Sequence, residues 1–391
     1  MSVPDHIPFV NSETDCRITQ KYYPDSPIIR VSLETLGKTA SHLPHAAKRW
    51  LDPAIDGLHR WPSVTQTYRD FLGAFAGFDR MGDVKFQEKP DKGVVQSFVR
   101  AVLDASKRRI PFEWLSVPQL PMIDGSGRNK INRMLAETTR LWKAESPYAG
   151  KLILPVIFTN QRQINSKTER NKKLALVMAC LEAANADGVW VVDSTLNDQD
   201  GSRTFEQTRF PGLLKLHQEL KQLLHGEAIV VGGPYWGINM VLWARGLLQY
   251  SAIGLGNSYQ YHIPGGVIKG ANARVALSPL RRWAIATPSL KSWLEKASSQ
   301  LSSSDPSGVE FLALAKDFGK LQADGRWQIA EFYKKWFDRF ATLPSSGRAL
   351  ALYQDLSSAY VVGKALPLLP SEEKTARSPA RVAKQLMLSC L

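Results

Sequence analysis

The first residue that could do chemistry is Asp193, a carboxylate that directly follows the apolar run 189–192. A carboxylate at the end of a buried strand is partly shielded from water. It can act as a general base, as a nucleophile or as an acceptor from the edge of a nucleobase. The structural alternative is that Asp193 caps the following turn. Glu88 and Asp124 follow other apolar runs and are further catalytic candidates.

Two glycine turns follow the next two apolar runs, Gly232-Gly233 after residues 228–231 and Gly254-Leu255-Gly256 after residues 252–255. Glycine lets the backbone approach a ligand closely, and the start of a helix offers free N–H groups to an anion. Two such turns on consecutive strands are typical of phosphate sites in barrels. The pattern predicts an anion site, unless the glycines only turn the chain.

Aromatic residues and a histidine accompany these turns. Tyr235, Trp236, Tyr259 and Tyr261 could stack on a planar ring, and Tyr259 is followed closely by His262, a candidate acid–base group. A histidine in a loop can equally be structural.

Two basic segments follow earlier apolar runs, and six of their cations are candidates for phosphate contacts: Arg128, Lys130, Arg133, Arg162, Lys167 and Arg170. Asn160 and Gln161 carry amides, which can read base edges. Positive charge at the start of a helix opposes the helix dipole, which makes a purely structural role less fitting.

The charge distribution supports an anionic partner. The net charge is +14, residues 92–173 hold 16 Lys and Arg against 6 Asp and Glu, and residues 228–294 contain no acid. Such asymmetry favours nucleic acid.

The remaining composition restricts the class of protein. Cys16, Cys180 and Cys390 are far apart and none forms a CxxC pair, so we expect no metal, no cofactor and no disulfide framework. No signal peptide and no run of about 18 apolar residues is visible, which predicts a cytoplasmic protein without a membrane partner.

The strands and helices that would position these residues can be predicted from the hydrophobic pattern. Short apolar runs alternate with helical segments, which indicates parallel strands joined by crossover helices. The eight candidate strands are 28–33, 84–87, 112–117, 152–158, 189–192, 228–231, 252–255 and 274–277. Eight strands favour a closed (βα)8 barrel of the triosephosphate isomerase (TIM) type over an open doubly wound sheet.

The predicted organisation has three parts. Residues 1–80 form an irregular, partly helical segment, residues 81–300 the barrel with a first strand possibly at 28–33, and residues 309–391 a helical extension rich in Trp, Phe and Tyr. The run 302–308 resembles a linker. The extension is expected to pack on the barrel or on a protein partner.

The layout resembles the barrel of the tRNA-guanine and DNA deazaguanine transglycosylases. Asp193, the Gly232-Gly233 turn and the turn at Gly254 match that family's order and approximate spacing within residues 150–260. The zinc-binding cysteines of the family are missing, and no acid occupies the place of its nucleophilic aspartate. The resemblance implies a base-exchanging transferase that modifies nucleic acid.

Three functions follow from these patterns. The first is a nucleic-acid-directed barrel enzyme acting at a base or its glycosidic bond. The second is a barrel enzyme for a small phosphorylated metabolite or flavin. The third is a non-catalytic subunit that binds nucleic acid or assembles into a complex. The patterns do not decide between DNA and RNA.

Overall fold

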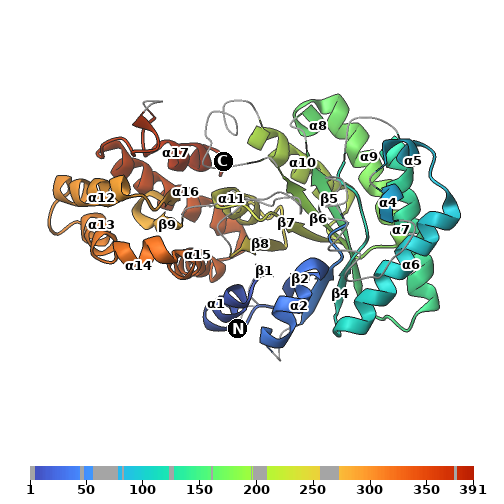
Figure 1. Ribbon diagram of the computed structural model, residues 1–391. Helices are drawn as coiled ribbons and strands as arrows, with labels where there is room; N and C mark the ends of the chain where they lie inside the picture. Colours follow the sequence, from blue (N-terminus) through green and yellow to red (C-terminus); the bar gives the residue numbers. More distant parts are fainter. Residues whose placement is uncertain are drawn as a thin grey trace.

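The computed structural model of the chain describes residues 5–44, 48–55, 78–81, 83–122, 127–159, 162–194, 196, 209–255, 273–373 and 377–391. Eight parallel strands close into a barrel in which each strand pairs with the next and the last pairs with the first (Figure 1). The strands are β1 (His6–Val10), β2 (Ile29–Ser32), β3 (Arg49–Asp52), β4 (Trp114–Ser116), β5 (Lys151–Phe158), β6 (Gly188–Asp193), β7 (Ile229–Gly232) and β8 (Tyr250–Gly254). The expected (βα)8 barrel is confirmed.

Two predicted strands are not part of this barrel. Residues 84–87 lie in helix α5 (Val84–Glu88), whose N-cap Asp83 accepts a hydrogen bond from the Lys85 amide. Residues 274–277 form β9 (Arg274–Leu277), which pairs antiparallel with β10 (Arg282–Ile285) in a separate sheet.

Strands β1 and β3 complete the eight-stranded barrel instead. The barrel therefore runs from residue 6 to residue 254 and includes much of the segment 1–80, which was expected to be irregular. With 5 and 4 residues, these strands are too short to leave a clear periodicity in the sequence.

An outer layer of helices covers the barrel, as near-continuous apolar strands require. Its helices are α1 (Glu13–Tyr22), α2 (Leu36–Thr39), α4 (Phe78–Met81), α5, α6 (Lys92–Arg109), α7 (Gly127–Glu145), α8 (Arg162–Asn165), α9 (Lys167–Ala184), α10 (Arg209–Leu223) and α11 (Gly237–Ala244). Helix α6 turns an apolar stripe that includes Phe98 and Val102 into the core.

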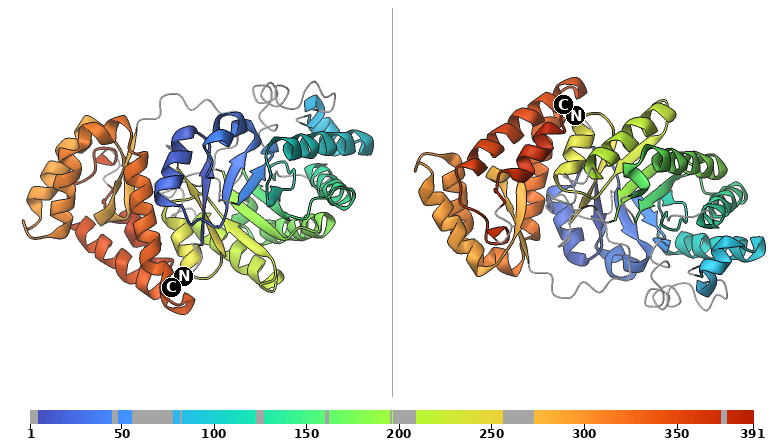
Figure 2. Two further views of the ribbon diagram at one scale, coloured as in Figure 1. Left: turned by 90° about the horizontal axis from the view of Figure 1, so that it is seen from below. Right: turned by 90° about the horizontal axis from the view of Figure 1, so that it is seen from above.

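The chain beyond the barrel is a mixed extension that begins at β9. It contains the two-stranded sheet and the helices α12 (Pro288–Gln300), α13 (Pro306–Lys316), α14 (Phe318–Ala323), α15 (Arg326–Ala341), α16 (Ser345–Lys364) and α17 (Arg381–Leu388). Residues 302–305 make the turn between α12 and α13, so the linker-like run connects two neighbouring helices of the extension. Both views in Figure 2 place the extension against one side of the barrel.

Helix α15 joins the two parts through its aromatic face. Trp236, which follows β7, stacks on Phe332 with 5.5 Å between ring centroids, and the Tyr333 hydroxyl donates to the Trp236 carbonyl at 3.1 Å. The core of the barrel continues without a break into α15, α16 and α17. The aromatic residues of α15 therefore pack on the barrel, whereas Trp293, Phe311 and Phe318 form a second core within the extension.

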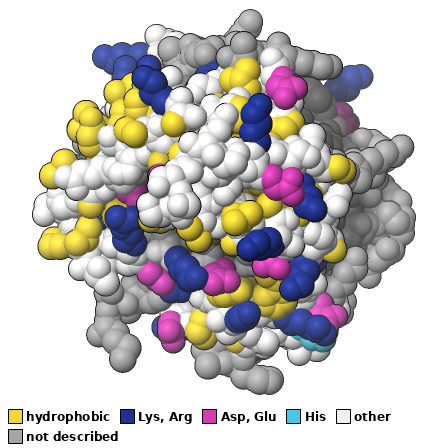
Figure 3. Space-filling model, turned by 90° about the vertical axis from the view of Figure 1, so that its left-hand side faces the viewer, with side chains coloured by type: hydrophobic (Ala, Val, Ile, Leu, Met, Phe, Trp, Pro, Cys, Tyr) yellow, Lys and Arg dark blue, Asp and Glu magenta, His cyan; other side chains and the backbone are white. Residues whose placement is uncertain are grey.

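The outer face of the extension carries mixed charge. Lys and Arg side chains are interspersed with Asp and Glu on this face, with apolar areas between them (Figure 3). It does not gather one sign of charge. Within the described residues, no helix is long and apolar enough to cross a membrane.

Candidate functional site

The carboxyl ends of the eight strands meet at one mouth of the barrel, where barrel enzymes carry their chemistry. Strands β6, β7 and β8 are adjacent and parallel, and Asp193, Gly232 and Gly254 end them at this rim. This part of the predicted geometry is confirmed.

An ion pair lies inside this mouth. Arg30 of β2 and Asp52 of β3 are on neighbouring strands, and both side chains are 3% exposed. Arg30 Nε donates to Asp52 Oδ2 at 3.1 Å, and its second guanidinium nitrogen donates to the same oxygen. The Ala54 amide donates to Asp52 Oδ1 at 3.0 Å. Burying two charges costs free energy unless they are paired and hydrogen-bonded, as they are here.

Aromatic rings hold the Arg30 guanidinium in place. Its central carbon lies 4.6 Å from the Phe9 ring centroid and 5.3 Å from that of Trp190. Phe9, Trp50 and Trp190 contact one another edge to face across the barrel interior. Cation–π attraction is strongest away from water, so these rings fix the cation that orients Asp52.

The loop after β4 supplies a neighbouring wall of the mouth, since β4 pairs with β3. Asn132 of α7 accepts from the Leu120 amide at 2.9 Å and donates to the Leu120 carbonyl at 3.0 Å. Gln119 Nε2 donates to the carbonyls of Pro118 and Asn132 at 2.9 and 3.0 Å. This network holds Gln119 in a fixed position beside the mouth.

A cavity of about 10 Å³ is lined by both Asp52 and Gln119. Its remaining walls are apolar and come from the loops after β3 and β4, from β5 and from Trp190. Because Pro155 and Ile157 line it, the odd-numbered positions of β5 face the barrel interior.

Asp193 faces away from this cavity. Trp190 points into the barrel, and side chains alternate along a strand, so Asp193 shares the outer face of β6 with Val191. Its register partner on β5 is Phe158, which lies on the outer face as well. Asp193 is fully buried at the rim, where its backbone amide donates to the Tyr235 hydroxyl. Of the two described aspartates Asp52 and Asp193, Asp52 is the one whose side chain reaches the mouth.

The Gly232-Gly233 turn does not form the expected anion cradle. The Gly233 N–H donates to the Val191 carbonyl at 3.1 Å, and the Gly233 carbonyl accepts from Trp190 Nε1 at 2.6 Å. Gly233 has a φ of +85°, and a Cβ there would lie 2.2 Å from Asn239 Nδ2. Close packing on Asn239 explains this glycine, since its N–H is already used within the protein.

The start of α11 is also closed to an anion. All its residues are buried, and a Cβ on Gly237 would lie 2.2 Å from Leu386 of α17. Tyr235 and Trp236 are 2% and 0% exposed, so neither ring offers a face to a ligand. The expected phosphate site and stacking residues at this turn are therefore wrong, because the extension covers them.

The basic candidates divide into two groups. Lys130 and Lys167 are exposed in the first turns of α7 and α9, and Arg133 is exposed in the second turn of α7. Arg170 is buried and donates to both Glu219 oxygens, at 2.7 and 2.9 Å, which lowers the pKa of Glu219. The expected phosphate contact of Arg170 is wrong, because helical spacing turns it toward α10.

Two further predicted residues that the structure describes, Glu88 and Gly254, do not enter the site. Glu88 ends the helix α5 in an exposed position, not a strand. Gly254 is held in register with Phe9 of β1. The side chains of Arg128 and Arg162 lie outside the described part of the chain, as do Asp124, Asn160, Gln161, Gly256, Tyr259 and His262.

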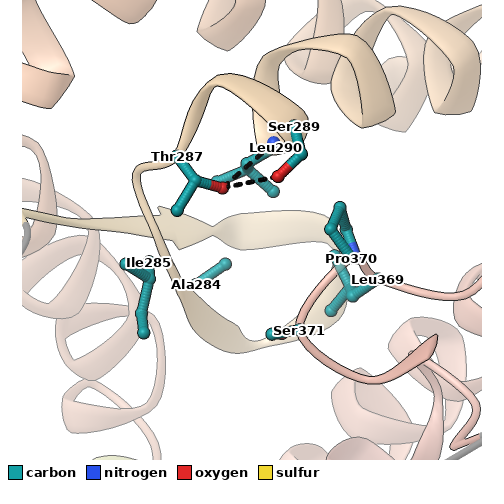
Figure 4. A pocket seen from close by; sticks show the side chains of 8 residues that line it. All are labelled: Ala284, Ile285, Thr287, Ser289, Leu290, Leu369, Pro370 and Ser371. Atoms are coloured by element: carbon teal, nitrogen blue, oxygen red, sulfur yellow. Dashed lines mark hydrogen bonds between the residues drawn. The ribbon is translucent and has the colours of Figure 1, made fainter. Parts of the chain in front are cut away.

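Two further cavities lie away from the mouth. One of about 180 Å³ in the extension is lined by β10, the start of α12 and residues 369–371; Thr287 and Ser289 hydrogen-bond to each other there at 2.9 Å (Figure 4). It contains no titratable side chain. The other, of about 720 Å³, lies at the C-terminal ends of α7 and α9, on the opposite face of the barrel from the mouth.

Metal and thiol chemistry find no support among the described residues. No group of three or more His, Cys, Asp or Glu there could hold a metal ion. Cys16, Cys180 and Cys390 are buried and free, and burial raises the pKa of each thiol to about 12.

Fold and site together define a (βα)8 barrel protein with a buried carboxylate–guanidinium pair in its mouth. No protein-family model matches the chain, and a search of curated proteins finds no significant match.

Arg30 and Asp52 were missed in the sequence. The signal available in the sequence is a charged residue, Arg30, inside the apolar run 28–33. Asp52 follows only two apolar residues, Trp50 and Leu51, and gave no strand signal.

Proposed function

We propose that this chain is a barrel enzyme directed at nucleic acid, acting at a base or at its glycosidic bond, with Asp52 as its reactive carboxylate. Arg30 positions Asp52, and Trp190 and Phe9 hold Arg30. The observation that carries the proposal is the buried Arg30–Asp52 pair inside the mouth. Carboxylates are the groups that act as base or nucleophile in glycosidic bond chemistry.

Nucleic acid is proposed as the substrate because of the positive charge around the mouth. Lys130, Arg133 and Lys167 are exposed around the mouth, in a chain of net charge +14. Exposed cations that begin neighbouring helices can follow a phosphate backbone past the mouth.

Replacing Asp52 tests the chemistry. Asp52→Asn keeps the shape of the side chain and should lower base release or base exchange by about 10²–10⁴-fold, the usual contribution of a positioned acid–base group. Bases released from single- and double-stranded DNA and RNA, and labelled free bases incorporated, are measured by mass spectrometry. Binding should be unchanged.

Glu219→Gln is the matched control, since it breaks the Arg170–Glu219 pair on the outer layer. Base release or base exchange should be unchanged in this variant. Full activity in a folded Asp52→Asn variant would contradict the role of Asp52.

Replacing Arg133 tests the binding surface. Arg133→Ala should weaken nucleic-acid binding and reduce the slope of log affinity against log salt by about 0.7–0.9 for each phosphate that Arg133 neutralises. Fluorescence anisotropy over a salt series measures both. Arg140→Ala is the control, because Arg140 is exposed on the same helix two turns further from the mouth. Equal effects of the two substitutions would argue against a binding rim.

A further inference from the structure

The cavity between Asp52 and Gln119 has the size and the chemistry of a site for one water molecule. A volume of about 10 Å³ is the least that a single water needs, and such a water also needs at least two polar partners. Asp52 and Gln119 are the lining residues whose side chains carry hydrogen-bond acceptors, so they are the candidate side-chain partners of such a water.

Each of the two side chains has an oxygen that can accept a hydrogen bond from the water. Within the part of the chain that the structure describes, Asp52 Oδ1 accepts one hydrogen bond, from the Ala54 amide, although a carboxylate oxygen can accept two. Gln119 Nε2 donates to two carbonyl oxygens, which only an amide NH2 group can do, so the orientation of this amide is fixed. Within the described residues, Gln119 Oε1 has no hydrogen-bond partner, and Gln119 lines the cavity.

We infer that Asp52 and Gln119 bind one water between them and that this water is the co-reactant, so that the enzyme hydrolyses its substrate. The inference rests on the proposed function for the identity of the bond that is cleaved. A water that donates one hydrogen to Asp52 and the other to Gln119 keeps its lone pairs free for attack.

The step balances without any other reactant. The water oxygen bonds to the anomeric carbon of the sugar, and the bond from that carbon to the base nitrogen breaks. The electron pair of that bond leaves on the base. Asp52 takes a proton from the water, and the departing base gains a proton through solvent. The products are a free base and an abasic site.

A high-resolution crystal structure tests the water site directly. We expect one ordered water within about 2.7–3.2 Å of both Asp52 Oδ1 and Gln119 Oε1. A dry cavity, or a water that does not contact Asp52, would overturn the inference. This result does not depend on any substrate.

Val117→Ile tests the role of the water. Val117 is fully buried and lines the cavity, and the added methyl group takes up about the volume of one water. The rate at which abasic sites form should fall by about 10²-fold or more in this variant. Val99→Ile makes the same change at an equally buried position on α6 and should leave the rate of abasic-site formation unchanged. Thermal melts of both variants show whether each is folded.

The products separate this inference from the proposed function. Abasic sites formed without incorporation of added free base support hydrolysis. Incorporation of a free base with no abasic product would refute hydrolysis and leave the proposed function standing. No release and no exchange would refute the proposed function, while the crystal structure still decides the water site. If Val117→Ile fails to fold, the crystal structure and the product analysis remain decisive.

Discussion

Two histidines show what burial does to a single ionisable side chain. His6 and His217 are buried, and among the described residues neither ring nitrogen of either has a hydrogen-bond partner. Burial lowers the pKa of each from 6.5 to about 3. For His6, which packs between Tyr23 and Phe337, the charge of Lys334 contributes a smaller part of this lowering of the pKa. Both rings are therefore neutral in the folded chain.

The sign of the pH dependence follows from these values. Below about pH 6.5 the unfolded chain binds a proton at each histidine that the folded chain refuses, so the free energy of unfolding falls as the pH falls toward 3. Each histidine contributes a slope of about 1.4 kcal/mol per pH unit. His217→Met should remove one such slope.

Urea denaturation at a series of pH values between about 4 and 7 measures this effect. His225→Met is the control, because His225 is exposed just beyond the same helix and its replacement removes no buried ring. An unchanged acid slope in His217→Met would show that His217 is not protonated on unfolding.

At the scale of elements, the turn from β7 into α11 depends on Asn239. Its side-chain amide donates to the carbonyls of Gly232 and Ala252 at 3.1 and 2.9 Å, which ties the ends of β7 and β8 together. The same side chain fills the space beside Gly233, whose φ is positive. The turn is built for packing, and its glycine is required by geometry.

Gly233→Ala should therefore lower the free energy of unfolding by more than the about 1–2 kcal/mol that the backbone strain alone would cost. In an Asn239→Ala background the clash is absent, and only the strain should remain. Chemical denaturation of the two single variants and the double variant measures the coupling. Purely additive effects would show that Asn239 does not limit this turn.

At the scale of the whole molecule, the extension and the barrel form one structural unit. Asp355 of α16 is 5% exposed and accepts from Arg281 at 2.7 and 2.8 Å, from Arg339 at 2.6 Å and from Trp336 at 3.0 Å. The Arg281 carbonyl in turn accepts from Trp236 Nε1 at 2.8 Å, beside the barrel. One carboxylate thus links the sheet of the extension, two of its helices and the β7–α11 turn.

Asp355→Asn should lower the free energy of unfolding by about 3–5 kcal/mol, the usual effect of breaking a buried ion pair. Because the core of the barrel continues into α15, α16 and α17, barrel and extension should still unfold in one transition. Coincident denaturation curves from tryptophan fluorescence and circular dichroism would verify this. A separate early transition with the barrel intact would contradict it.

The sequence by itself determined the layer architecture. Long apolar strands such as residues 152–158 and the alternation with helical segments predicted a parallel barrel, because local hydrophobic periodicity reports burial directly. It also placed Asp193, Gly232 and Gly254 at one rim, since parallel strands all point their carboxyl ends the same way.

Only the tertiary structure decided what those residues face. Asp193 is turned outward by strand alternation, the Gly233 N–H is used by Val191, and Arg170 is paired with a helix 49 residues away in sequence. The Arg30–Asp52 pair joins two strands whose sequence signals are weak. A side chain's partner is set by contacts between distant segments, and no local pattern carries that information.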